Sequence, residues 1–189
     1  YSFSAKPFVW LHRLLLTMIV ATGVAFVTMV SLAYSVDTIV TWSLPTVPIS
    51  LWLNALVGGP LLAAITLYAA QWRALAGRFG LLLMTVPFIA LAANMAAYIV
   101  QGRLLNGVAN SVVAAADLVP HYRTMLLVFA LMCFAGCVLA AFTMHAVSRE
   151  AVAHGGGELA FSKRVLVRLL VSCLLVFAGI FVMRFAFYM

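Results

Sequence analysis

The sequence predicts an all-α fold, a polytopic bundle of transmembrane helices that forms a single domain over residues 1–189. Apolar residues make up 67% of the chain and charged residues only 8%, whereas soluble domains are about 45–50% apolar and about 25% charged. The mean hydropathy is +1.19. This composition excludes a soluble domain, a disordered chain and a reader of nucleic acid. The net charge of +7 is therefore assigned to membrane flanks.

Charged and proline-rich segments divide the chain into runs that can each cross a bilayer core, which takes roughly 20 apolar residues. Pro45 and Pro48 favour a loop over 37–50 before the second run. Pro60, after Gly58 and Gly59, predicts a kink that either packs closely on a neighbouring helix or shapes a ligand pocket. The five predicted spans are 14–35, 51–71, 79–101, 123–147 and 165–189.

The distribution of Lys and Arg predicts the orientation of these spans, because cytoplasmic flanks carry the excess of both residues. With the N-terminus of the segment inside, the inner flanks hold eight Lys and Arg and the outer flanks hold three. The C-terminus is then outside. The chain begins at Tyr1 without a Met and stops within an apolar run, so we expect it to be an incomplete portion of a longer polypeptide.

Two of the loops carry further signals. In the outer loop over 102–122, apolar residues recur at helical spacing from Leu105 to Val119 and predict an interfacial helix that lies on the membrane surface. The same pattern fits a docking surface for a soluble partner. The loop over 148–164 contains Gly155, Gly156 and Gly157 and is predicted to be a flexible cytoplasmic loop.

The histidine and cysteine positions do not fit a metal site. The four histidines lie at span ends or in a loop, so no haem is expected in this subunit, because a membrane haem needs axial ligands at matched depth. Cys133 and Cys137 lie four residues apart within one span, where packing is the simplest role. No ionisable residue lies in the middle of a span, which weakens the interpretation of the chain as a transporter.

Polar residues instead gather at the predicted outer ends of the first and third spans. Tyr34 and Asp37 follow the first span, and Tyr98 and Gln101 share a face of the third. They fit either an aromatic belt with polar caps or the wall of a quinol pocket, with Asp37 as the acidic group that accepts protons. These four residues are the candidate quinol-binding residues, and no catalytic or metal-binding residue is assigned.

Several blocks occur in an order and spacing that resemble the membrane anchor subunit of dimethyl sulfoxide reductase and its close relatives, the DmsC-like family. The resemblance spans most of the chain, from the first predicted span to the end. The blocks are Tyr34 to Trp42, Gly58 to Leu62, Gln101-Gly102, Ser111 to Tyr122 and Arg184 to Tyr188.

The resemblance implies eight transmembrane helices with both termini outside, of which this chain would hold the last five. It implies an anchor in the bacterial inner membrane that binds menaquinol and passes its electrons to an iron–sulfur subunit. That subunit relays them to a molybdopterin catalytic subunit, which reduces dimethyl sulfoxide or a similar S-oxide or N-oxide in anaerobic respiration. The family's quinol-binding His and Glu belong to its first three helices, so none is carried onto this sequence.

Three other functions remain open at this point. A related anchor could serve a polysulfide, tetrathionate or selenate reductase, because the catalytic subunit selects the acceptor. A transporter would need a polar site at the midplane and internal repeats. A purely structural anchor would make no contact with quinol.

Overall fold

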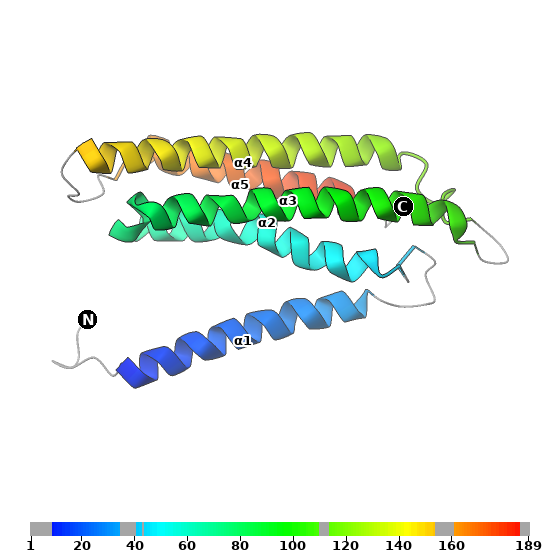
Figure 1. The fold of residues 1–189 in the computed structure, drawn as a ribbon, viewed down its shortest axis with the longest axis horizontal. Coiled ribbons are helices and arrows are strands. Elements are labelled where there is room, and N and C mark those ends of the chain that lie inside the picture. Colours follow the sequence, from blue (N-terminus) through cyan, green and yellow to red (C-terminus); the bar gives the residue numbers. More distant parts are fainter. Residues whose placement is uncertain (1–8, 35–40, 43, 110–113, 154–160, 186–189) are drawn as a thin grey trace.

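The computed structural model describes residues 9–34, 41–42, 44–109, 114–153 and 161–185, with the backbone alone at 73, 76 and 153. Five long helices dominate these residues: α1 (Val9–Ala33), α2 (Thr46–Ala69), α3 (Arg78–Leu104), α4 (Tyr122–Ala153) and α5 (Lys163–Phe185) (Figure 1). Two short 3-10 turns, η1 (Arg73–Ala76) and η2 (Leu105–Gly107), flank α3. Each long helix is long and apolar enough to cross a membrane. The predicted all-α bundle with five spans is confirmed.

The helices extend beyond the predicted spans. α2 begins at Thr46 and holds Pro48 in its first turn, so the loop predicted over 37–50 ends too late. Proline is tolerated there because first-turn N–H groups have no partner within the helix. α4 continues to Ala153 and α5 begins at Lys163, which shortens the loop predicted over 148–164. Charged residues mark where a helix leaves the bilayer, and the helix itself continues into water.

Four of the helices pack as a bundle, and α1 crosses beside them (Figure 1). α4 and α5 run antiparallel in extensive contact, α3 packs on α2 and α4, and α2 also contacts α5. α1 packs mainly on α2, and Ser31 is its buried residue. The shared core contains fully buried Val57, Phe129 and Val176. The outward surface stays apolar, as in Phe142 with 71% of its surface exposed, which fits contact with lipid.

Small residues let α4 and α5 approach closely. A Cβ atom added at Gly136 would lie 2.6 Å from the Ser172 carbonyl oxygen, and one added at Gly179 would lie 2.9 Å from Cys133 Sγ. Cys133 is itself fully buried, and its thiol donates to the Val176 carbonyl at 3.5 Å. Small residues at such contacts are the usual basis of helix packing in membranes. The packing role predicted for Cys133 agrees with this contact.

The segment around Pro60 combines a bend with a close contact. Pro60 lies inside α2, and Figure 1 shows that helix changing direction about midway. A Cβ atom at Gly58 would lie 3.1 Å from the ring of Phe177 on α5, whereas one at Gly59 would meet nothing within 4 Å. The close helix contact is therefore confirmed at Gly58 alone.

The connection between α3 and α4 differs from the interfacial helix predicted within 102–122. α3 runs to Leu104, η2 follows, and Ala109 and Ala114 then form an antiparallel backbone bridge. The described part of this loop contains no α-helix after Leu104. The apolar positions are nonetheless the buried ones, since Leu105 and Ala115 pack with Leu44. The one-sided pattern identified a buried face that belongs to a folded loop.

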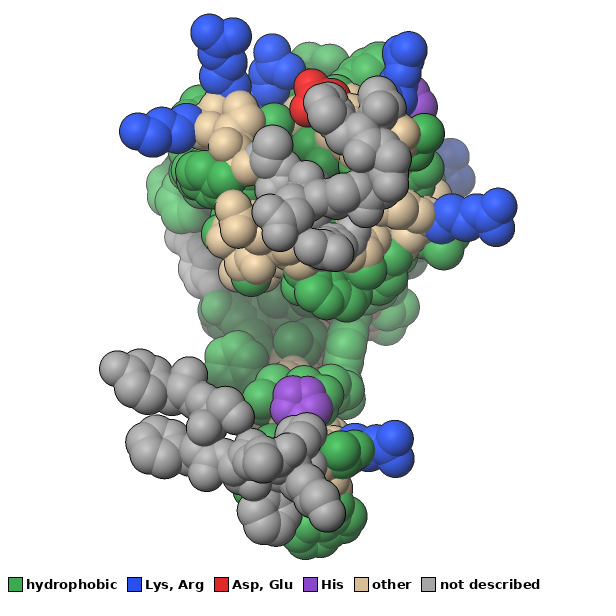
Figure 2. Space-filling view, turned by 90° about the vertical axis from the view of Figure 1, so that its left-hand side faces the viewer, with side chains coloured by type: hydrophobic (Ala, Val, Ile, Leu, Met, Phe, Trp, Pro, Cys, Tyr) green, Lys and Arg blue, Asp and Glu red, His purple; other side chains and the backbone are tan. Residues whose placement is uncertain are grey.

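The bundle has two ends, which we name by one residue each. The Gln101 end holds the starts of α2 and α4 and the ends of α1, α3 and α5, and the Lys163 end holds the opposite termini (Figure 1). Figure 2 looks onto the Lys163 end and shows cations around its rim. Among the described residues, this end carries Arg13, Arg78, Arg149, Lys163, Arg164 and Arg168, and the Gln101 end carries Arg103, Arg123 and Arg184.

Candidate functional site

A series of buried polar side chains joins α2 to α3 near the Gln101 end. Asn54 on α2 lies at its centre. The Asn54 Oδ1 atom accepts a hydrogen bond from Asn94 Nδ2 at 2.6 Å, and Asn54 Nδ2 donates to the Tyr98 hydroxyl at 3.1 Å. Asn94 and Tyr98 are fully buried, and Asn54 is nearly so. We call Asn54, Asn94 and Tyr98 the α2–α3 polar network.

A second polar layer lies closer to the end of the bundle. Its residues are three or four positions away from those of the network along α2 and α3, which is about one helical turn of about 5.4 Å. Gln101 on α3 is fully buried, and neither its Oε1 nor its Nε2 has a hydrogen-bond partner among the described residues. Ser50 on α2 is also fully buried and accepts a hydrogen bond from the guanidinium of Arg184 on α5 at 3.1 Å. Three helices thus contribute polar groups to this layer.

Sequence spacing builds both layers. Thr46, Ser50 and Asn54 recur every four residues on α2, and the polar residues of α3 recur at Asn94, Tyr98 and Gln101. Either spacing places the residues on one face of a helix. Because hydrocarbon offers no hydrogen bonds, polar side chains in a membrane turn toward neighbouring helices. The two polar stripes therefore face one another.

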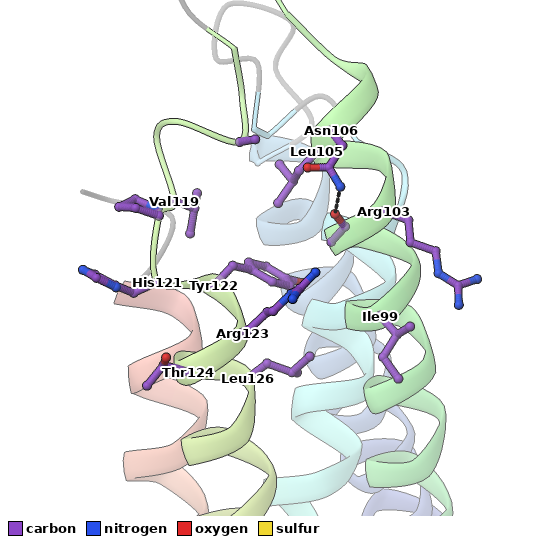
Figure 3. Close-up of a pocket in the computed structure, with 13 residues that line it drawn as sticks. Ile99, Arg103, Leu105, Asn106, Val119, His121, Tyr122, Arg123, Thr124 and Leu126 are labelled. Atoms are coloured by element: carbon purple, nitrogen blue, oxygen red, sulfur yellow. Dashed lines mark hydrogen bonds between the residues drawn. The ribbon is translucent and has the colours of Figure 1, made fainter.

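A cavity of about 640 Å³ opens between the end of α3 and the start of α4 (Figure 3). We call it the end cavity. Its volume falls within the range of small-molecule sites, about 300–1,000 Å³. Its lining combines cationic side chains such as Arg103 and Arg123 with apolar Ile99 and Leu126.

Tyr122 also lines the end cavity and connects it to the polar network. Its hydroxyl donates to the backbone carbonyl of Tyr98 at 2.6 Å. Its ring lies against α3, where a Cβ atom at Gly102 would come within 2.8 Å of the ring. The absence of a side chain at Gly102 thus lets Tyr122 pack between the cavity and the network.

Comparison with known proteins assigns the protein to a family. The model of the DMSO reductase anchor subunit family (DmsC) matches residues 5–189. The chain belongs to this family. It is 33% identical over 120 residues to the anaerobic dimethyl sulfoxide reductase protein YnfH of Escherichia coli K12, covering 61% of this chain and 39% of that protein. It is 34% identical over 117 residues to the C subunit of the anaerobic dimethyl sulfoxide reductase of the same organism, covering 61% and 40%. Each match thus spans about two-fifths of the relative's length, and no solved structure matches the sequence.

In this DmsC-family protein the structure brings together two of the four predicted site residues. Tyr98 belongs to the polar network, and Gln101 lies in the next layer on the same helix. Tyr34 is partly buried and packs its ring on Trp42, with centroids 5.0 Å apart, beside the apolar cluster that contains Leu105. Asp37 lies outside the described residues.

The sequence interpretation missed the polar residues that other helices contribute to the two layers and to the end cavity. Asn54, Ser50 and Arg184 come from α2 and α5, and Tyr122 from the start of α4. One signal was present for Asn54, since an amide within an apolar span is uncommon and marks an interior position. Arg184 lay at the end of a span and had no such signal.

The described residues include no group of three or more His, Cys, Asp or Glu side chains that could hold a metal ion. His12 and His121 are exposed near the starts of α1 and α4, and His145 is exposed within α4. The polar residues of the site can form hydrogen bonds. Amides and hydroxyls donate and accept, while the guanidinium of Arg184 only donates.

Proposed function

We propose that this chain is part of the membrane anchor of a dimethyl sulfoxide reductase-type complex in the bacterial inner membrane, and that the anchor oxidises menaquinol. Its electrons pass to an iron–sulfur subunit and then to a molybdopterin catalytic subunit that reduces dimethyl sulfoxide or a similar oxide. Family membership and the five membrane-length helices support this assignment. The larger number of cations at the Lys163 end supports placing that end in the cytoplasm and the Gln101 end outside.

The observation that carries the quinol proposal is the buried amide of Gln101. Leaving a buried donor or acceptor unsatisfied costs about 1–3 kcal/mol, and Gln101 leaves both of its side-chain heteroatoms without a described partner. An amide offers one acceptor and one donor group, which fits the hydroxyl and oxo forms of a quinone headgroup. Tyr98 and Asn54 lie one turn deeper, and Asn54 Nδ2 donates a hydrogen bond to the Tyr98 hydroxyl.

Quinol oxidation yields two electrons and two protons, and the protons require an acceptor. The polar side chains of the network donate and accept hydrogen bonds. Their role is to bind and orient the hydroxyl groups. Asp37 is our candidate acceptor, because it is acidic and follows α1, which ends at the same end of the bundle.

Access to Gln101 requires a movement of α2. Gln101 is fully buried and shares its layer with Ser50 of α2. Pro60 removes one backbone hydrogen bond from α2, and the helix changes direction about midway along its length (Figure 1). We expect the part of α2 between Thr46 and Gly59 to swing away from α3 when quinol enters.

The test uses the complete anchor in its complex, purified gently from membranes. Subunits, molybdenum, iron and extractable menaquinone are measured first, and all should be present. Replacing Gln101 by Leu should then raise the KM for a menaquinol analogue about ten-fold, as expected for the loss of roughly 1.4 kcal/mol of binding. Reduction of the acceptor by an artificial dye, which bypasses the anchor, should stay normal.

The matched control is Thr85→Val, because Thr85 is an exposed polar residue on the same helix whose hydroxyl bonds only to the Leu82 carbonyl among the described residues. Its quinol kinetics should match those of the wild type. Unchanged kinetics in both Gln101→Leu and Asp37→Asn would refute the proposed pocket. A polypeptide purified without metal-containing subunits or quinone would refute the anchor function itself.

A further inference from the structure

The end cavity contains two arginines that the polar network does not use. Arg103 lies in the last turn of α3 and Arg123 in the first turn of α4, and both line the cavity. Both are exposed, and neither guanidinium group makes a hydrogen bond or ion pair with another described residue. They are two of the three described cations at the end of the bundle that is poorer in cations. Because both guanidinium groups lie at the same cavity without a described partner, we expect this cavity to bind another molecule.

The chemistry of the cavity indicates an anionic partner. No acidic residue lines it among the described residues, and His121 adds a third basic side chain. Figure 3 shows Arg123 extending from α4 into the space between α4 and α3, whereas Arg103 projects along the outer side of α3. The first turn of α4 also faces the cavity through Thr124 and contributes the partial positive charge of a helix N-terminus.

The remaining wall identifies the kind of anion. Ile99 lies one turn deeper than Arg103, and Leu126 lies about one turn deeper than Arg123. Ile99 has 45% of its surface exposed on the membrane-spanning part of α3. The cavity thus carries cations at the level of the lipid headgroups and apolar side chains toward the bilayer. Acyl chains would gain from contact with this apolar wall, whereas a soluble inorganic anion would not.

We propose that the end cavity binds the phosphate headgroup of an anionic phospholipid, with its acyl chains along Ile99 and Leu126. Arg123 is the principal phosphate contact, because it reaches into the cavity. Arg103 contributes less from the rim. Basic pockets between transmembrane helices are a recurring form of lipid recognition, and arginine suits the phosphate because its planar fork donates several hydrogen bonds. The site is separate from Gln101 and does not depend on quinol binding.

The test measures lipid retained by the complete anchor complex in mild detergent, by native mass spectrometry and lipid extraction. The wild-type complex should retain phosphatidylglycerol or another anionic phospholipid. Arg123→Gln should lower that retention about ten-fold, the loss expected for one charge-assisted contact. Arg103→Gln should lower it about three-fold, because a solvated rim contact is weaker.

Arg78→Gln is the matched control, because Arg78 is an exposed first residue of α3 at the opposite end of the bundle. It should leave retention unchanged. A second measurement compares thermal unfolding in nanodiscs of phosphatidylglycerol and of phosphatidylcholine. Phosphatidylglycerol should stabilise the wild-type complex and not Arg123→Gln, while both should unfold alike in phosphatidylcholine, which shows that the variant folds.

Three results would overturn the proposal. Equal lipid retention in Arg123→Gln and Arg78→Gln would show that the cavity does not select the lipid. If inorganic phosphate added to phosphatidylcholine nanodiscs stabilised the wild type as phosphatidylglycerol does, the ligand would be a free anion. If Arg123→Gln kept its lipid and lost its partner subunits, the cavity would be a protein contact.

Discussion

Gly136 offers a direct test of the packing between α4 and α5. Replacing it by Ala would place the new Cβ atom 2.6 Å from the Ser172 carbonyl oxygen and 2.8 Å from a methyl group of Val176. The carbonyl belongs to the backbone of α5, so it cannot rotate away as a side chain can. The two helices must separate locally by about 0.5 Å or more, enough to lose a quarter or more of the dispersion energy of the contacts involved.

The magnitude follows from two opposing terms. Overpacking a well-packed contact costs typically about 1–3 kcal/mol, whereas Gly→Ala inside a helix gains about 0.5–1 kcal/mol of helix propensity. The difference between these terms runs from about 0 to about 2.5 kcal/mol, so we expect Gly136→Ala to lower the free energy of unfolding by about 1 kcal/mol. Gly136→Leu should cost more, because the larger side chain meets the same backbone.

Gly23→Ala is the matched control, since Gly23 lies inside α1, does not precede a proline, and a Cβ atom there meets nothing within 4 Å, so only the propensity gain remains. Unfolding of the purified protein or complex is followed in mixed micelles by circular dichroism. Gly136→Ala should unfold at a lower denaturant fraction than the wild type, and Gly23→Ala at an equal or higher one. If Gly136→Ala proved as stable as Gly23→Ala, the close approach of α4 and α5 would be refuted.

Two further substitutions test the Gln101 end by the same unfolding assay. Tyr98→Phe removes the acceptor of Asn54 Nδ2. It should lower the free energy of unfolding by about 0.6–1.7 kcal/mol, the range measured for hydrogen bonds between membrane helices. An unchanged free energy of unfolding would show that Asn54 finds another acceptor. Gly102→Ala forces its Cβ atom against the ring of Tyr122 and should destabilise the protein by about 1 kcal/mol. In a Tyr122→Ala background the same change should be neutral or stabilising, and an equal cost in both backgrounds would exclude that clash as the cause.

The five spans could be predicted because hydropathy and length decide which segments cross a membrane. Helix ends could not be predicted from the same signal. Hydropathy reports where a segment leaves the bilayer, whereas Ser148 to Ala153 continue α4 and Thr46 to Ser50 begin α2 outside the predicted spans. The prediction placed Pro48 in a loop, although the first turn of a helix accepts proline.

The outer loop shows that apolar residues at helical spacing do not always form a helix. Apolar residues at helical spacing correctly marked Leu105 and Ala115 as buried. Asn106 and Gly107, however, are turn-favouring residues, and the described residues after them are extended or turned up to the start of α4. Burial of one face can be satisfied by packing against the end of a bundle, so the spacing alone did not require a helix.

Two of the proposed site residues could be placed together from the sequence because they lie on one helix. Tyr98 and Gln101 are three residues apart on α3, so local geometry alone placed them on a common face. Asn54 and Arg184 reach the site because of how α2 and α5 are aligned along α3. That alignment depends on side-chain packing along the whole interface. No spacing within one span encodes that alignment.

The geometry of α3 explains why its end serves two chemically different compartments. Successive residues of an α-helix point about 100° apart, so Gln101 turns into the bundle while Gly102 meets Tyr122 of α4. The side that faces the bundle is buried, and its hydrogen-bonding side chains are neutral apart from the partly buried Arg184, which suits the hydroxyl groups of a quinol. The other is open and basic, which suits a phosphate. Because Tyr122 bonds to the backbone of Tyr98 rather than to its side chain, loss of an anion from the end cavity would leave the hydrogen bonds of Asn54 intact.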